Sequence, residues 1–217
     1  MTISTGATRR HDPAHWLAFV RAWARDPLRT AAVSPSGTQL ARLMVAQLPA
    51  VAFAADAPVI ELGAGTGVFT QALLDAGVAP QQLLVIELNR DLHRILMRRF
   101  PRVRVECADA CHIAELAARH GIAGHSVAAV ISGLGLLSMP RAVVARVIAA
   151  STSLLHPQGR LVQFTYGPFS PVPPALRERH GLRAQRCGVA WRNMPPATVY
   201  SYRHAAPAPA RPAAAAD

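Results

Sequence analysis

The sequence predicts an α/β fold of the Rossmann-like type, built on a mostly parallel sheet of seven strands. Short apolar runs alternate with helical patterns from residue 59 onward, which is typical of right-handed βαβ units. A glycine-rich turn, residues 61–67, joins the first apolar run directly to a helical pattern. Residues 182–191 and 198–204 alternate like a terminal pair of strands, so we expect an antiparallel strand at the C-terminal side.

The composition fits one large α/β domain with additions. Of 217 residues, 51% are hydrophobic, and the formal net charge is +11 with no lysine in the chain. This surplus of arginine favours an anionic partner, and the alternatives are a solvated basic surface or a biased genome. The three cysteines form no C-x-x-C motif, so reduced thiols and no metal site are expected. No apolar run reaches the length of a membrane-spanning helix, and no secretory signal is visible, so a cytoplasmic location is expected.

The N-terminal part predicts disorder followed by helices. We expect residues 1–11 to be disordered, residues 12–50 to form N-terminal helices, residues 51–204 to form the main domain, and the Ala/Pro-rich residues 205–217 to be an unstructured tail. The first helix begins at Asp12 and ends before Pro27. Its apolar face either lies on a membrane interface or packs on the domain as a lid, and the pattern favours neither. That face has helical spacing and consists of Trp16, Phe19, Val20 and Trp23.

Residues 27–37 predict an ordered loop, because Pro, Ser and Gly recur in it. Arg29, Ser34 and Ser36 are close together in this segment and are able to bind a phosphate, although serines also simply hold turns. A second helix follows, capped by Ser36 or Thr38.

The glycine turn is the most specific feature of the chain. Its glycines are Gly63, Gly65 and Gly67, with Ala64 between the first two. A dinucleotide-binding G-x-G-x-x-G motif would place its third glycine at residue 68. The pattern E-x-G-x-G-x-G, with Glu61 two residues before the first glycine, resembles motif I of the class I S-adenosylmethionine-dependent methyltransferases.

The remaining elements follow in alternation. The region 169–179 is rich in proline and predicts a loop. Strands are predicted at 59–62, 82–87, 103–107, 127–132 and 159–166, and helices at 67–76, 89–100, 113–120 and 140–155.

Three carboxylates come at the ends of predicted strands, where an open α/β sheet holds its ligand. Glu61 ends the first strand, Glu87 ends the second, and Asp109 follows the third. Glu87 suits the two hydroxyls of a ribose, and Asp109 suits an adenine amino group, with Leu88 and Ala110 on either side of the purine. The alternative for Glu87 and Asp109 is capping of the helices that follow.

The segment after the fourth strand does not favour a stacked base as the methyl acceptor. It reads Ser132-Gly133-Leu134-Gly135-Leu136-Leu137, without the aromatic residue that stacks a flipped base. The run Asn193-Met194-Pro195-Pro196 resembles such a motif but comes after the next-to-last strand, where we do not expect it to serve. The apolar side chains of this segment, together with the clustered arginines of the chain, instead favour an amphiphile with an anionic headgroup as the substrate.

Five stretches together resemble the bacterial phospholipid N-methyltransferases, which are relatives of the ribosomal RNA adenine dimethylases. They are 27–36, the glycine turn, 132–137, 163–168 and 193–200, in the expected order. Gly135 departs from the proline usual there. The resemblance implies the class I methyltransferase fold, S-adenosylmethionine as cofactor, and methylation of phosphatidylethanolamine towards phosphatidylcholine by an enzyme that sits peripherally on the inner face of the cytoplasmic membrane. No obligate protein partner is inferred.

For the reaction we expect direct transfer to a neutral amine, which the carbonyls of Ser132, Gly133 and Leu134 orient. Tyr166 stabilises the cationic product or binds the phosphate, or it only fills the core. The cofactor is expected on residues Glu61, Gly63, Ala64, Gly65, Gly67, Glu87, Leu88, Asp109, Ala110 and Ser132, and the lipid phosphate on Arg29, Ser34, Ser36, His180 and Arg183.

Two alternatives remain from the sequence. One is an RNA adenine or small-molecule amine N-methyltransferase, which the missing aromatic after the fourth strand disfavours. The other is a basic cofactor-binding module without activity, which the complete set of acids and glycines disfavours. Nucleic acid is therefore not the expected partner.

Overall fold

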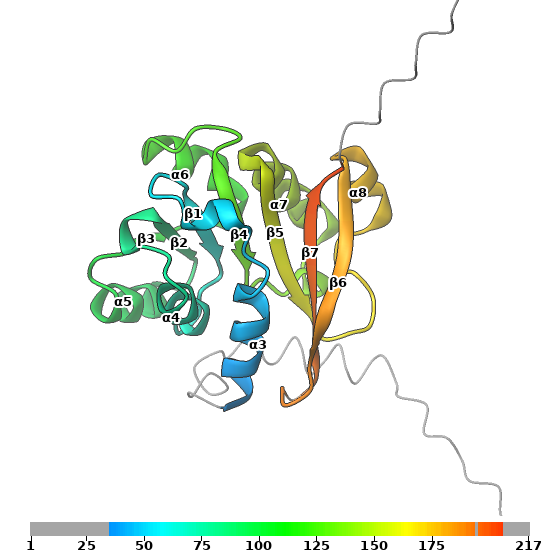
Figure 1. Ribbon diagram of the computed structural model, residues 1–217, viewed down its shortest axis with the longest axis horizontal. Coiled ribbons are helices and arrows are strands. Elements are labelled where there is room, and N and C mark those ends of the chain that lie inside the picture. The colour runs from blue at the N-terminus through cyan, green and yellow to red at the C-terminus, as the bar shows by residue number, and fades with distance from the viewer. Residues whose placement is uncertain (1–34, 194, 206–217) are drawn as a thin grey trace, which may run out of the picture.

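A computed structural model describes residues 35–193 and 195–205, with side chains from residue 37 onward (Figure 1). Its seven strands form one sheet in the order β3-β2-β1-β4-β5-β7-β6. β1 to β5 are parallel, whereas β7 is antiparallel to both of its neighbours. The prediction of a mostly parallel seven-stranded sheet is confirmed. The strands are β1 (Val59–Leu62), β2 (Leu83–Glu87), β3 (Arg104–Cys107), β4 (Val127–Ser132), β5 (Leu155–Thr165), β6 (Leu182–Ala190) and β7 (Ala197–His204).

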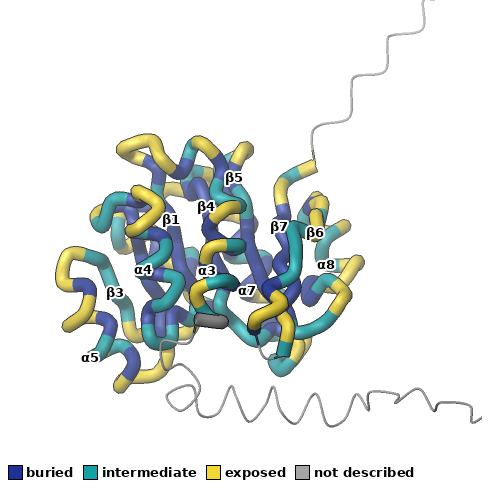
Figure 2. The backbone as a smooth tube through the Cα atoms, turned by 60° about the horizontal axis from the view of Figure 1, so that its bottom comes forward, coloured by how far each residue is buried: buried dark blue, intermediate teal, exposed yellow. Residues whose placement is uncertain are grey.

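Helices cover both faces of the sheet, so the fold has three layers (Figure 1). The central strands are buried on both sides, which explains why their sequences are continuous apolar runs rather than alternating ones (Figure 2). The helices are α3 (Pro35–Val45), α4 (Val68–Asp75), α5 (Arg90–Arg99), α6 (Ile113–Arg119), α7 (Arg141–Leu154) and α8 (Pro174–Arg179), with short turns η1 (Ala50–Phe53), η2 (Pro80–Gln82), η3 (Ala110–His112) and η4 (Leu136–Ser138).

Two apolar cores result from the alternation along each strand. In β1, Val59 packs towards the core under α3, α4 and α5, whereas Ile60 and Leu62 pack towards the core under α6 and α7. Glu61 therefore lies on the same face as α4. This placement decides which helix meets the first acid of the glycine turn.

Helix α3 is part of this body. Leu40 and Met44 are buried in the same core as Val59, and Leu43 approaches β6 at Gly188. A Cβ at Gly188 would lie 3.3 Å from the Leu43 side chain, and its φ of 146° disfavours other residues. The helix predicted at residues 12–26 lies outside the described residues.

Two local predictions differ from the structure. The proline-rich region is a loop only to residue 173, because Pro174 takes the first position of α8, where a missing N–H costs nothing. β5 begins at Leu155, directly after α7, and a register shift between Val127 and Ala129 on β4 accommodates the extra residues. None of the described helices has the length and apolarity to cross a membrane.

Candidate functional site

The glycine turn lies at the carboxyl edge of the sheet, between β1 and α4. Gly63, Gly65 and Gly67 all have positive φ values, 67°, 59° and 86°, which other residues rarely adopt. The three glycines differ in their surroundings. A Cβ at Gly67 would lie 2.4 Å from the Phe100 ring, and one at Gly63 would lie 2.7 Å from the Leu134 side chain. A Cβ at Gly65 would meet nothing within 4 Å. The middle glycine therefore borders open space, and the outer two hold the turn against its neighbours.

Glu61 is fully buried beside this turn. Its Oε2 accepts a 2.7 Å hydrogen bond from the Thr70 hydroxyl on α4. Its Oε1 is buried and has no hydrogen-bond partner among the described residues. Burial raises the pKa of Glu61 to about 8, although the hydrogen bonds from Thr70 oppose the shift. A buried carboxyl with one unused oxygen is prepared for a donor or a cation that the described residues do not supply.

Glu87 connects β2 to the glycine turn. Its Oε2 accepts a hydrogen bond from the Gly65 N–H and its Oε1 one from the Asn89 N–H, each 2.8 Å long. The carboxylate is 7% exposed, so it is held between two backbone groups at the edge of the site. The contact explains how an acid 22 residues after Gly65 comes to border the same space.

Asp109 and Leu88 form the outer part of this region. Asp109 accepts a 2.8 Å hydrogen bond from the Cys111 N–H and caps η3, and this bond holds the pKa of its carboxyl below the usual range. The helix-capping role is therefore present in the structure. Leu88 is 67% exposed although it is apolar, whereas Ala110 is buried. An exposed leucine directly after β2 suits a surface that a ligand covers.

The segment after β4 closes the turn from the other side. A Cβ at Gly133 would lie 2.5 Å from the Gly63 carbonyl oxygen, so the two loops touch through backbone. The Leu134 carbonyl accepts from the Gln163 side chain at 2.8 Å and from the Leu136 N–H at 2.9 Å. Both lone pairs of that carbonyl are then taken, so Leu134 shapes the loop and does not offer a carbonyl to an amine. Ser132 is buried, and its hydroxyl accepts from the Leu134 N–H at 3.4 Å.

Tyr166 stands at the carboxyl end of β5 and is half-buried. Its ring makes an edge contact with Phe164, whose ring in turn meets Phe69 on α4, with centroid distances of 5.3 and 6.0 Å. This row of rings connects the helix of the glycine turn to Tyr166. Burial raises the pKa of Tyr166 to about 12, so the hydroxyl keeps its proton at neutral pH.

The Tyr166 hydroxyl is hydrogen-bonded to the side chain of Asn193, a residue that the sequence did not predict at the site. Asn193 is 8% exposed and its amide also donates to the Pro195 carbonyl at 3.3 Å. The turn between β6 and β7 lies beside the end of β5, because Thr165 pairs with Thr198 and Val189 with Thr198 in the antiparallel ladders. Strand direction, rather than distance along the chain, is the signal that places Asn193 at this edge.

Several predicted site residues are elsewhere. His180 follows the last residue of α8 and Arg183 lies near the start of β6, at the amino edge of the sheet, and the structure does not bring them to the glycine turn. Ser36 is in the first turn of α3, and its side chain is not described. Arg29, Ser34 and the face formed by Trp16, Phe19, Val20 and Trp23 lie outside the described residues.

A known structure matches this arrangement over almost the full length of the chain. The Burkholderia thailandensis 1,6-didemethyltoxoflavin N1-methyltransferase, solved with S-adenosylhomocysteine, is 15% identical, with a TM-score of 0.58 over 94% of each chain. The chain has the class I S-adenosylmethionine-dependent methyltransferase fold. No protein-family model matches it.

Two curated relatives are similar in sequence. An ornithine lipid N-methyltransferase from Singulisphaera acidiphila is 28% identical over 142 residues, which are 64% of this chain and 71% of the relative. A ribosomal RNA small subunit methyltransferase A from Maridesulfovibrio salexigens is 42% identical over 52 residues, or 24% of this chain and 19% of that protein. The second likeness is local.

S-adenosylmethionine is the cofactor of the class I methyltransferase fold, and the residues at this edge fit it. The cofactor is a nucleoside with cationic sulfonium and ammonium groups, and it therefore requires acids and a close backbone. Glu61 has an unused buried oxygen, Gly65 leaves its Cβ space open, and Leu88 presents an uncovered apolar surface. Among the described residues, no three His, Cys, Asp or Glu side chains gather as metal ligands would.

Proposed function

We propose that this chain methylates the amine of a membrane lipid, with phosphatidylethanolamine and its mono- and dimethyl forms as substrates and phosphatidylcholine as the final product. The observation that carries the proposal is an exposed apolar rim on the acceptor side of the carboxyl edge. Leu137, Phe169 and Trp191 follow β4, β5 and β6, and they are 44%, 81% and 72% exposed. Large apolar side chains exposed at one edge suit an oily partner.

The polar part of the acceptor site is the Tyr166–Asn193 pair. Tyr166 keeps its proton at neutral pH, so its role is to orient the amine or the headgroup phosphate and not to remove a proton. Its ring also stabilises an ammonium product. Once a lipid covers the apolar rim, water is excluded from the site, and a dry surrounding lowers the pKa of the substrate amine towards its reactive neutral form.

The donor side of the proposal uses the acids of β1, β2 and β3. Glu61 and the glycine turn hold the amino-acid end of the cofactor, Glu87 the ribose, and Asp109 with Leu88 and Ala110 the adenine. S-adenosylmethionine supplies the electrophilic methyl group. The remaining rate acceleration comes from positioning, because in-line transfer to a held amine requires no covalent step on the protein.

The relative from Singulisphaera acidiphila, an ornithine lipid N-methyltransferase, supports an amine-bearing lipid as the substrate class. We further propose that the protein works at the inner face of the cytoplasmic membrane and that Trp16, Phe19, Val20 and Trp23 attach it there. Clustered aromatic side chains opposite arginines suit that interface.

An RNA adenine acceptor is the second candidate, and one observation favours it. Trp191 is exposed two residues before Asn193, and an exposed indole beside an amide is able to stack and bind a base. The sequence likeness to the ribosomal RNA methyltransferase is confined to 52 residues.

The test is incubation of the protein with methyl-labelled S-adenosylmethionine and one of three acceptors. These are phosphatidylethanolamine in phosphatidylglycerol vesicles, ornithine lipid in the same vesicles, and total RNA. We expect label in the phosphatidylethanolamine. Label in ornithine lipid alone would show that the substrate is a lipid amine with a different headgroup. Label only in RNA would overturn the proposal.

A further inference from the structure

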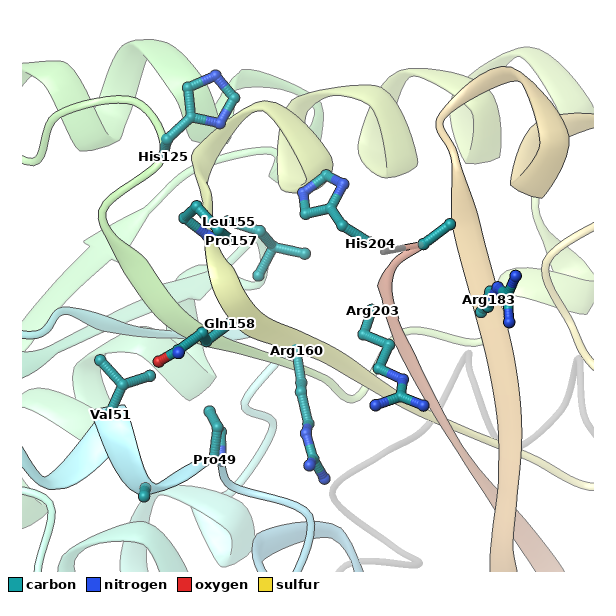
Figure 3. Close-up of a pocket in the computed structure, with 12 residues that line it drawn as sticks. Pro49, Val51, His125, Leu155, Pro157, Gln158, Arg160, Arg183, Arg203 and His204 are labelled. Atoms are coloured by element: carbon teal, nitrogen blue, oxygen red, sulfur yellow. The ribbon is translucent and has the colours of Figure 1, made fainter. Parts of the chain in front are cut away.

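A row of three arginines crosses the sheet at its amino edge, opposite the glycine turn. Arg183 on β6 pairs directly with Arg203 on β7. Leu161 on β5 pairs with Tyr202 in the antiparallel ladder, which places Arg160 opposite Arg203. Residues directly opposite in a ladder share one face of the sheet. All three side chains therefore project on the face of α3 and η1, at neighbouring positions (Figure 3).

Nothing described in the protein neutralises this row. Like charges directly opposite each other destabilise a sheet. None of the three arginines forms an ion pair with a described carboxylate, and within the described residues the Arg160 guanidinium donates to the Gln47 carbonyl alone, at 3.3 Å. That bond holds Arg160 in place without offsetting its charge. The row therefore keeps a local positive charge that an anion would stabilise.

The row borders a cavity of about 720 Å³. No described residue that lines the cavity is acidic, and two histidines add donors at its rim, His125 and His204 (Figure 3). His125 has a φ of 58°, a left-handed conformation that costs energy for a non-glycine residue and is often found at functional sites. The cavity has the size of a small-molecule site.

We propose that this cavity binds a phosphate-bearing anion. Guanidinium groups bind phosphate oxygens in a bidentate way, and three of them on adjacent strands match a group with two or more negative charges. The site is separate from the proposed methyl-transfer site, because β4, β5 and β7 run from one edge of the sheet to the other between them. The phosphate belongs either to a free phosphorylated molecule or to a lipid headgroup, and the experiment separates the two.

The first arm is calorimetric titration of the full chain with inorganic pyrophosphate, with Arg203→Gln and Arg183→Gln as test variants. Arg186→Gln is the matched control, because Arg186 is an exposed arginine on the same strand three residues after Arg183, and so on the opposite face. We expect saturable binding that weakens about tenfold or more in each test variant and is unchanged in the control. No saturable binding, or equal binding by all four proteins, would overturn the proposal.

Thermal melting gives an independent measurement on the same proteins. Without anion and at low salt, Arg203→Gln is expected to raise the melting temperature by about 1–3 °C, because it removes the repulsion in the row. Pyrophosphate is expected to raise the melting temperature of the unmodified protein and to leave that of Arg203→Gln unchanged. A variant that melts lower and still responds to pyrophosphate would contradict the role of the row.

The second arm is sedimentation with phosphatidylglycerol vesicles, with and without pyrophosphate. If the natural phosphate is a headgroup, Arg203→Gln loses vesicle binding and pyrophosphate competes for it. If it belongs to a free molecule, pyrophosphate binds but vesicle binding is unaffected by the substitution. Both outcomes support the anion site and identify its source, and neither depends on methyl transfer.

Discussion

At the carboxyl edge of the sheet backbone N–H groups bind two of the acids, whereas at the amino edge no described carboxylate pairs with the arginines. Glu87 accepts two backbone hydrogen bonds and Asp109 one, while Glu61 keeps a single oxygen unused in a buried place. Arg183 and Arg203, in contrast, face each other across a ladder with no described carboxylate to pair with. The carboxyl edge is arranged for a cationic nucleoside, and the amino edge for an anion.

The largest expected effect is the loss of cofactor affinity on Glu61→Gln. The amide has nearly the same shape but cannot become an anion, so the cationic cofactor loses its buried counter-charge. We expect the dissociation constant for S-adenosylmethionine to rise about tenfold to a hundredfold in calorimetry. Glu115→Gln, an exposed acid on α6, is the control and is expected to bind normally. Unchanged affinity in Glu61→Gln would show that Glu61 does not bind the cofactor.

Glu61 also predicts how stability depends on pH. Its pKa is raised from 4.5 to about 8, so between these values the unfolded chain has lost a proton that the folded chain retains. Stability is therefore highest at the acidic end of this window and falls as the pH rises towards 8, by up to about 1.4 kcal/mol per pH unit. Urea unfolding between pH 5 and 8 measures the slope. The free energy of unfolding of Glu61→Gln is expected to depend less steeply on pH. Equal slopes for the variant and the unmodified protein would show that Glu61 titrates normally.

The Tyr166–Asn193 pair predicts a smaller effect, confined to the acceptor. Tyr166→Phe and Asn193→Ala each lose the same hydrogen bond, and we expect kcat/KM for phosphatidylethanolamine to fall about three- to tenfold in each. The double variant is expected to be no worse than the stronger single one, because both remove one contact. Cofactor affinity is the control and should not change. Fully additive losses of kcat/KM would show that the two residues act independently.

The apolar rim predicts an effect of similar size that is confined to vesicle binding. Replacing Phe169 or Trp191 by Ala removes an exposed ring that we expect to enter the lipid interface, and binding should weaken about three- to tenfold in sedimentation. Phe53→Ala is the matched control, since Phe53 is 50% exposed in η1 at the other edge. Equal losses in Phe53→Ala would mean that the carboxyl edge has no special part in binding.

The position of the glycine turn between β1 and α4 was predictable from the sequence because its signals are local. Glu61, the three glycines and the first residue of the helix after them lie within eight residues, 61–68, so spacing alone separates this turn from a dinucleotide motif. Glu87 also follows from strand order, since β2 is the neighbour of β1.

The acceptor side and the amino edge depend on pairings that sequence patterns do not contain. Asn193 reaches Tyr166 only because β6 and β7 form an antiparallel hairpin whose turn lies beside the end of β5. Arg183 was expected near the substrate, but its strand begins at the opposite edge and its register places it beside Arg203. A shift of one residue in that ladder would have turned one of the two arginines to the other face.

The most direct test of the account is methyl transfer to phosphatidylethanolamine vesicles by three proteins measured together: the unmodified chain, Glu61→Gln and Glu115→Gln. Labelled S-adenosylmethionine is held below its dissociation constant, and label is counted in the extracted lipid. We predict label with the unmodified chain and with Glu115→Gln, and a tenfold or greater loss of label with Glu61→Gln. Lipid without label from the unmodified chain, or equal label from all three proteins, would contradict it.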